Sequence, residues 1–225
     1  MFVGHLAVGF LGKRVAPRVS VAFLIFCTTF LDVLWPVFIL LGIEHAAIVP
    51  GLTPASPLDL YDYPWSHSLL MALVWSLALA APWLVRRQRR EALVIAACVF
   101  SHAVLDVVSH RADVPLFPGS DVKIGLGLWY SRTGTVVVEG GLWAIALLIY
   151  ARAFRPTSAW GKWGLWSLAV LLTLAWLGGV YGPPPSNIRT LAASALPAIA
   201  VFTAWVWSVE RRRVSVAGDE RGRGP

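Results

Sequence analysis

Cysteine is scarce in this chain, and the few present do not predict a disulfide framework. The only two, Cys27 and Cys98, lie in separate apolar stretches and form no CxxC pair. Isolated cysteines of this kind usually behave as small buried hydrophobic residues. A phosphate-binding loop is excluded as well, because the chain has no GxxxxGK[ST] motif and GLGLW, residues 125–129, is too short a glycine pattern.

Charged residues are also few, at 14% of the chain, whereas 57% of the residues are hydrophobic. Soluble domains contain roughly 45–50% apolar residues, so the composition indicates a membrane protein. The 12 tryptophans are typical of aromatic belts at membrane interfaces. The net charge of +7 does not predict a nucleic-acid partner, because Lys and Arg fall in short clusters between apolar runs.

The apolar runs predict an all-α integral membrane protein with about six transmembrane helices. They cover roughly residues 20–43, 66–85, 91–110, 135–152, 162–180 and 190–209. Each is close to the ~20 residues that cross a bilayer core, and Pro36 is expected to kink the first near its outer end. Residues 1–210 would form one polytopic domain without internal repeats. Residues 211–225 would form a disordered basic tail.

The distribution of positive charge predicts that both termini are cytoplasmic. Under this topology most of the 19 Lys and Arg residues fall on one side, including the RRQRR cluster at 86–90. The other side holds only Arg111, Lys123, Arg132 and Arg189. By the positive-inside rule, loops 44–65 and 111–134 then face outside, and their length suggests that they carry function. The N-terminal segment is not expected to be a signal peptide, because its positive charges follow its apolar run.

The stretch SHAVLDVVSH, residues 101–110, places ionisable side chains inside an apolar helix. A helix advances about 100° per residue, so His102, Asp106 and His110 line one stripe. A histidine followed four residues later by an aspartate can hold one metal ion. The alternative is a polar patch satisfied between helices. Ionisable residues inside a membrane cost ~2.5–3.5 kcal/mol on insertion scales and usually mark a functional interior.

Other helices carry ionisable residues at a matching depth. Counted at ~1.5 Å per residue, Asp32, His67 and Glu139 reach the outer half of the bilayer together with His102 and Asp106. We therefore expect these five side chains to line one pocket that opens to the exterior.

The remaining candidates are less directly indicated. Arg111 could bind an anionic group such as phosphate, or be an ordinary loop charge. His110, Asp62 and Asp113 are candidates for the mouth of the site. His5 lies in FVGHLAVGF, which is too short to span a membrane. This segment is either a short half-helix that dips in from the cytoplasmic face or an amphipathic anchor along the interface.

Four short motifs together resemble a known family. They are GHLAVGF, FLDVLWP, YPWSHSLL and SHAVLDVVSHRADVPLFP, and they follow one another within residues 3–118. In this order they are similar to the Gly-His, Pro-Asp-x-Asp-His-Pro, His-x5-His and Ser-His-x3-Asp segments of the LexA-regulated, inner-membrane metal-dependent hydrolases of bacteria. The chain departs from that pattern at Leu34, Trp35 and Asp62, which replace an Asp, a His and a His of the family motifs.

The resemblance implies a divalent metal site in the bacterial inner membrane. Its ligands would be His67, His102 and Asp106, followed by His5 on an inserted half-helix and Asp32. Asp62 or Glu139 would compensate for the missing ligands.

Imidazole and carboxylate ligands without thiolates suit Zn²⁺, and Mn²⁺ or Fe²⁺ less well. Such an ion activates water for attack on a phosphoester, ester or amide. Asp32 or Glu139 would act as general base or orient a ligand, and Arg111 would stabilise an anionic leaving group. The location of the site in the membrane favours membrane lipids as partners and a lipid or envelope-derived substrate.

Two other hypotheses for the function are an ion- or proton-coupled transporter and a non-catalytic scaffold with a structural metal or polar cluster.

Overall fold

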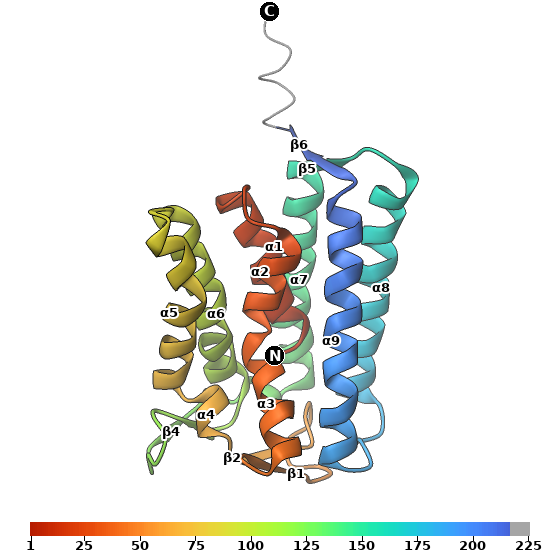
Figure 1. Ribbon diagram of the computed structural model, residues 1–225. Helices are drawn as coiled ribbons and strands as arrows, with labels where there is room; N and C mark the ends of the chain where they lie inside the picture. Colours follow the sequence, from red (N-terminus) through yellow and green to blue (C-terminus); the bar gives the residue numbers. More distant parts are fainter. Residues whose placement is uncertain (217–225) are drawn as a thin grey trace, which may run out of the picture.

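A computed structural model describes residues 1–216 as a helical bundle with short strands at its ends (Figure 1). The helices are α1 (Val3–Val15), α2 (Val21–Thr28), α3 (Phe30–Leu41), α4 (Pro64–His67), α5 (Leu69–Val85), α6 (Arg89–Ser109), η1 (Leu128–Tyr130, a 3₁₀ helix), α7 (Arg132–Ala153), α8 (Ala159–Tyr181) and α9 (Ile188–Glu210). Antiparallel ribbons pair β1 (His45–Ile48) with β2 (Leu58–Asp62), β3 (Val114–Pro115) with β4 (Lys123–Ile124), and β5 (Phe154–Pro156) with β6 (Arg213–Ser215).

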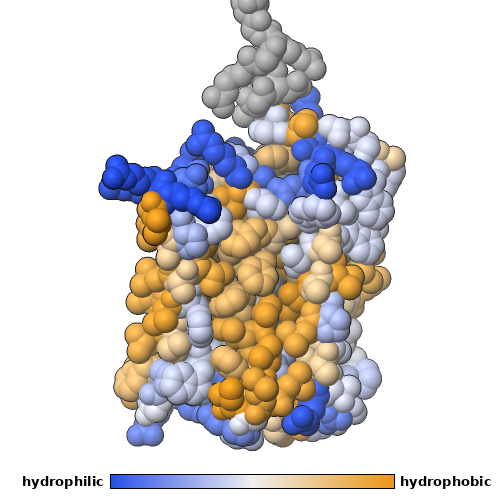
Figure 2. Space-filling view, viewed as in Figure 1, coloured by the Kyte–Doolittle hydropathy of each residue, from blue (hydrophilic) through white to orange (hydrophobic). Residues whose placement is uncertain are grey.

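The helices make this chain a multi-pass membrane protein with four or five candidate spans among the described residues. The helices α6 to α9 are long and apolar enough to cross a bilayer, and the bent pair α2–α3 is a fifth if it is one span. The expected span 66–85 is divided, because α4 ends at His67 and Ser68 caps the 17-residue helix α5 by accepting a bond from the Met71 N–H. Figure 2 shows an apolar band across the middle of one face, with hydrophilic residues gathered near the ends.

The expected span 20–43 bends at Thr29, and the helix α3 is continuous through Pro36. Helices α2 and α3 meet there at 50°, whereas Pro36 lies inside α3. The hydroxyls of Thr28 and Thr29 both donate to the Ile25 carbonyl at 2.9 Å. Bonds of this kind from Thr to a carbonyl of the preceding turn bend helices. The bend leaves the Thr28 carbonyl at the end of α2, where it is available to a neighbouring helix.

Helix α1 is buried inside the bundle, and this excludes the alternative of an anchor along the interface. It packs against α7, α2 and α6, and His5 is 1% exposed. Its approach to α2 depends on Gly9, since a Cβ there would lie 2.8 Å from Ile25 Cγ1 and 3.0 Å from Ile25 Cα. Cys27 and Cys98 are buried and free, as expected.

The end of α9 is tied to the start of α2. Glu210 accepts bonds from Lys13 Nζ at 2.6 Å, Ser20 Oγ at 2.6 Å and the Val21 N–H at 2.9 Å. Just beyond, Arg213–Ser215 forms β6 and pairs with β5. The expectation of a disordered tail from residue 211 is therefore wrong for these three residues. Residues 217–225 of that tail lie outside the described residues.

Candidate metal centre

Four candidate ligands converge where α3, α4 and α6 meet, in the half of the bundle that carries the β1–β2 ribbon (Figure 1). His102 Nε2 lies 3.1 Å from Asp106 Oδ2, and His67 Nε2 lies 3.8 Å from the same oxygen. Both nitrogens lie 3.7 Å from Asp32 Oδ1. Tetrahedral ligands bound about 2.1 Å from an ion lie roughly 3.4 Å from one another. The spacings therefore fit ligands that share one metal ion.

The orientation of His102 provides the strongest indication of a cation. Its Nδ1 lies 2.7 Å from the Thr28 carbonyl, which can only accept, so Nδ1 carries the proton. In the neutral ring Nε2 then presents a lone pair to Asp106 Oδ2. Neither atom has a hydrogen-bond partner among the described residues, and both are buried. Two buried lone pairs that face each other are costly, and either a metal ion between them or a proton on Nε2 removes the cost.

His67 is oriented in the same way by a buried chain of polar groups. Ser66 Oγ donates to Glu44 Oε2 at 2.6 Å and lies 2.7 Å from His67 Nδ1, so it accepts the Nδ1 proton. Burial raises the pKa of Glu44, and the bonds from Ser66 oppose this shift by favouring the carboxylate. Outer partners of this kind fix the tautomer of a metal-binding histidine. His67 Nε2 is left facing the two aspartates.

The second oxygen of Asp106 faces another group of nitrogens. Oδ1 lies 3.2 Å from His5 Nε2, 3.4 Å from His110 Nε2 and 2.9 Å from the α-amino group of Met1. The rings of His5 and His102 are stacked, with centroids 3.7 Å apart and planes inclined by 2°. Asp106 thus lies between two sets of nitrogens, one on each of its oxygens.

His110 is held by residues of the loops at this end of the bundle. Its Nδ1 lies 3.2 Å from Asp113 Oδ1, and the same oxygen accepts a bond from the Tyr63 hydroxyl at 3.0 Å. Burial and the Asp113 carboxylate raise the pKa of Tyr63 well above its ordinary value, so the phenol remains a donor. Trp129 stacks on the His110 ring at 4.2 Å. The His110 proton therefore lies on Nδ1, toward Asp113.

Two loop residues expected at the site are engaged elsewhere. Arg111 pairs with Asp59 and with Asp113, so its guanidinium positions Asp113 and does not point to the converging ligands. Asp62 pairs with His45 at 2.8 Å, in the β1–β2 ribbon. It therefore does not compensate for a missing ligand beside His67.

Glu139 does not lie where a general base would act on a metal-bound water. Its Oε1 accepts bonds from the Phe2 N–H and, at 3.1 Å, from the Gly4 N–H, and its Oε2 accepts one from Trp176 Nε1 at 3.1 Å. Both oxygens are thus occupied, Oε1 by the start of α1 and Oε2 by the Trp176 indole of α8. Glu139 satisfies the free N–H groups of that helix terminus and so holds the helix that carries His5.

The structure therefore brings six of the predicted residues together at one centre: His5, Asp32, His67, His102, Asp106 and His110. The supporting residues Thr28, Glu44, Ser66 and Tyr63 were not predicted from the sequence. The position of Ser66 directly before His67 is a local signal that could have identified it. Glu44 reaches the site only through the tertiary fold.

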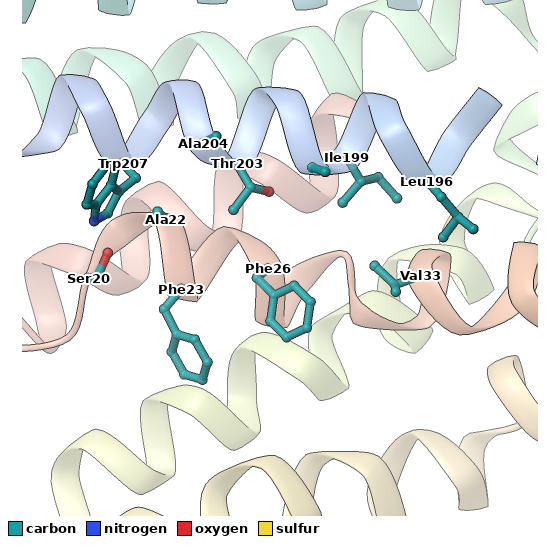
Figure 3. Close-up of a pocket in the computed structure, with 11 residues that line it drawn as sticks. Ser20, Ala22, Phe23, Phe26, Val33, Leu196, Ile199, Thr203, Ala204 and Trp207 are labelled. Atoms are coloured by element: carbon teal, nitrogen blue, oxygen red, sulfur yellow. The ribbon is translucent and has the colours of Figure 1, made fainter. Parts of the chain in front are cut away.

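Access to the centre lies at Asp32. Its side chain is 36% exposed, compared with 6% for His67 and 3% for Asp106. The neighbouring Val33 lines an apolar groove of about 590 Å³ between α2–α3 and α9, which also includes Phe26 and Ile199 (Figure 3). The six gathered residues do not line this groove.

Comparisons with protein-family models, curated proteins and solved structures find no match to this chain.

Proposed function

We propose that this chain is a membrane-embedded metal-dependent hydrolase that acts on an ester or phosphoester of a lipid or envelope-derived molecule. The observation that carries the proposal is the pair of buried, unpartnered atoms His102 Nε2 and Asp106 Oδ2, which face each other at 3.1 Å with His67 and Asp32 beside them. Because the ligands are imidazoles and carboxylates without thiolates, Zn²⁺ is the proposed ion, ahead of Mn²⁺ or Fe²⁺.

The chemistry of the candidate ligands and the exposure of Asp32 support a hydrolytic site over a purely structural one. An ion bound here would supply a Lewis acid and a nucleophilic water near neutral pH. His67 and His102 are held rigidly through their Nδ1 atoms, so they serve as ligands. Asp32 is the exposed member, and its carboxylate can accept a proton from the attacking water or complete the ligand set. With Asp32 as the base, three protein ligands remain and one coordination position stays open, as in catalytic zinc sites.

The apolar groove supports a lipid as substrate. Asp32 and Val33 are neighbours in α3, one facing the candidate ligands and the other the groove. The groove is lined almost entirely by apolar side chains and is large enough for part of an acyl chain. A lipid that lies along it would bring its polar end to the level of Asp32.

The proposal includes six spans in a bacterial inner membrane, with the end of α1 and the end of α9 on the cytoplasmic side and the α-amino group of Met1 inside the bundle, 2.9 Å from Asp106 Oδ1. In this topology α5 and the bent pair α2–α3 each cross the bilayer. The charge distribution supports it, because the Arg-rich turn 86–90 lies at the end of the bundle opposite the β1–β2 ribbon (Figures 1 and 2). The metal centre would then open toward the outer face.

Metal analysis of the detergent-purified protein tests the proposal first. We expect stoichiometric metal in the wild type and in His45→Ala, a control at an exposed position of β1, and loss of metal in His102→Ala. A wild type that binds no stoichiometric metal would refute the proposal.

Turnover on a panel of phospholipids and model esters tests the chemistry. We expect activity in the wild type and at least a 100-fold loss in Asp32→Asn, at an unchanged unfolding temperature. Bound metal without turnover on any substrate would favour the scaffold. Proton- or ion-coupled uptake into proteoliposomes that is lost in Asp106→Asn would favour the transporter.

A further inference from the structure

The two oxygens of Asp106 face two separate sets of nitrogens, and we infer that the centre holds two divalent cations bridged by this carboxylate. The first is the ion of the proposed function, on Oδ2, and the inference rests on that proposal. The second would lie on Oδ1, held by His5 and His110.

The stacking of His5 on His102 is the observation that requires two separate metal-ion positions. An imidazole nitrogen binds an ion along its lone pair, which lies in the plane of the ring. The two rings are parallel within 2° at a centroid distance of 3.7 Å, so no point lies in both planes. An ion midway between them would be up to about 1.8 Å out of each plane, which is about 60° away from the lone pairs for a bond of about 2.1 Å. One ion therefore cannot be bound well by both rings.

The spacing of the rings matches that of a two-metal site. Ions bound in the planes of the two rings would be separated by about the ring spacing of 3.7 Å. Paired catalytic ions usually lie about 3.5–4 Å apart. Asp106 is aligned with the stack, since Oδ2 lies 3.1 Å from His102 Nε2 and Oδ1 lies 3.2 Å from His5 Nε2. Each oxygen of the carboxylate therefore faces a different ring.

The second position also has unpartnered donor atoms. Neither ring nitrogen of His5 has a hydrogen-bond partner among the described residues, and the side chain is buried. His110 keeps its proton on Nδ1, toward Asp113, and directs the Nε2 lone pair at Asp106 Oδ1 from 3.4 Å. A carboxylate that orients a histidine in this way is a common outer partner of metal sites.

A rival explanation is available on the same oxygen. The α-amino group of Met1 lies 2.9 Å from Asp106 Oδ1, and an ammonium there would satisfy this oxygen without a second ion. The metal content distinguishes the two explanations. The chemical consequence also differs, because paired ions can stabilise both the attacking and the leaving oxygen of a phosphoester.

Zinc content after reconstitution tests the inference. Purified protein is loaded with Zn²⁺, freed of unbound ion and analysed by mass spectrometry. We expect two zinc ions per chain in the wild type and in the control His45→Ala, and one in His5→Ala and in His110→Ala. One ion in the wild type and in both variants would overturn the second position and leave the proposed function standing. No bound ion in the wild type would overturn both.

A measurement on the wild type avoids variants that fail to fold. X-ray absorption of the zinc-loaded protein should show zinc–zinc scattering at about 3.5–4 Å. After loading with Mn²⁺, electron paramagnetic resonance should show an exchange-coupled pair. A signal from isolated Mn²⁺ at full loading, without metal–metal scattering for zinc, would overturn the inference.

Discussion

Replacing Ser66 by alanine should weaken metal binding although Ser66 is not a ligand. Its hydroxyl accepts the His67 Nδ1 proton at 2.7 Å and donates to Glu44 Oε2 at 2.6 Å. In Ser66→Ala the His67 ring loses the partner that fixes its tautomer and direction. The buried Glu44 carboxylate keeps only the bond from the Ser66 N–H, at 2.7 Å.

The size of the effect follows from this geometry. Loss of an outer partner typically lowers metal affinity 10–100-fold, which corresponds to about 1.4–2.7 kcal/mol. The apoprotein should also lose about 1–3 kcal/mol of stability, because His67 Nδ1 is buried and left unpaired. The affinity can be measured by competition with a fluorescent zinc chelator in detergent, and the stability by thermal unfolding without metal.

Ser76→Ala is the matched control. Ser76 is a buried serine on α5 whose hydroxyl donates to the Ala72 carbonyl of its own helix. We expect its zinc affinity to equal that of the wild type. If Ser66→Ala binds zinc as tightly as Ser76→Ala, the chain from Glu44 to His67 does not orient a ligand, and the reasoning is refuted.

Two further predictions concern the packing of the bundle and are checked by thermal unfolding in detergent. Gly9→Ala should cost about 1–3 kcal/mol because its Cβ would collide with α2, whereas Gly141→Ala, with nothing within 4 Å of the added Cβ, should be neutral or stabilising by up to ~1 kcal/mol. Equal shifts for the two variants would contradict the close approach of α1. Glu210→Gln should cost about 1.5–3 kcal/mol, since Glu210 accepts charge-assisted bonds from Lys13 and the start of α2. Glu91→Gln, whose ion pair with an exposed arginine is 3.8 Å long, should change stability by less than about 0.5 kcal/mol, and a comparable loss would contradict this difference.

Several features of the fold and of the centre could be predicted because they depend on one helix at a time. Hydropathy runs identified the long helices α6 to α9. The four-residue spacing placed His102 and Asp106 together, since that relation is set by the helix itself. Counting residues along each helix predicted that His67 and Asp32 lie at the same depth. In the structure their side chains meet there.

Other features could not be predicted in this way, because the depth of a residue along its helix does not determine the direction in which its side chain points. Glu139 has the depth expected of a site residue, but it faces the start of α1 and is used as a cap. Asp62 is near His67 in the sequence, but the β1–β2 ribbon pairs it with His45. The bend at Thr29, which presents a carbonyl to His102, lies seven residues before the proline that was expected to kink the span.

The amino-acid sequence alone predicts a helical membrane protein with histidines and aspartates inside its apolar helices. Both follow from composition and from the period of the α-helix, which are local properties. Only the tertiary structure decided which atoms face one another: the Nδ1 partners of His67, His102 and His110, the stack of His5 on His102, and the two sides of Asp106. These depend on how each helix is rotated and how closely it packs against its neighbours, and no single segment encodes that relation.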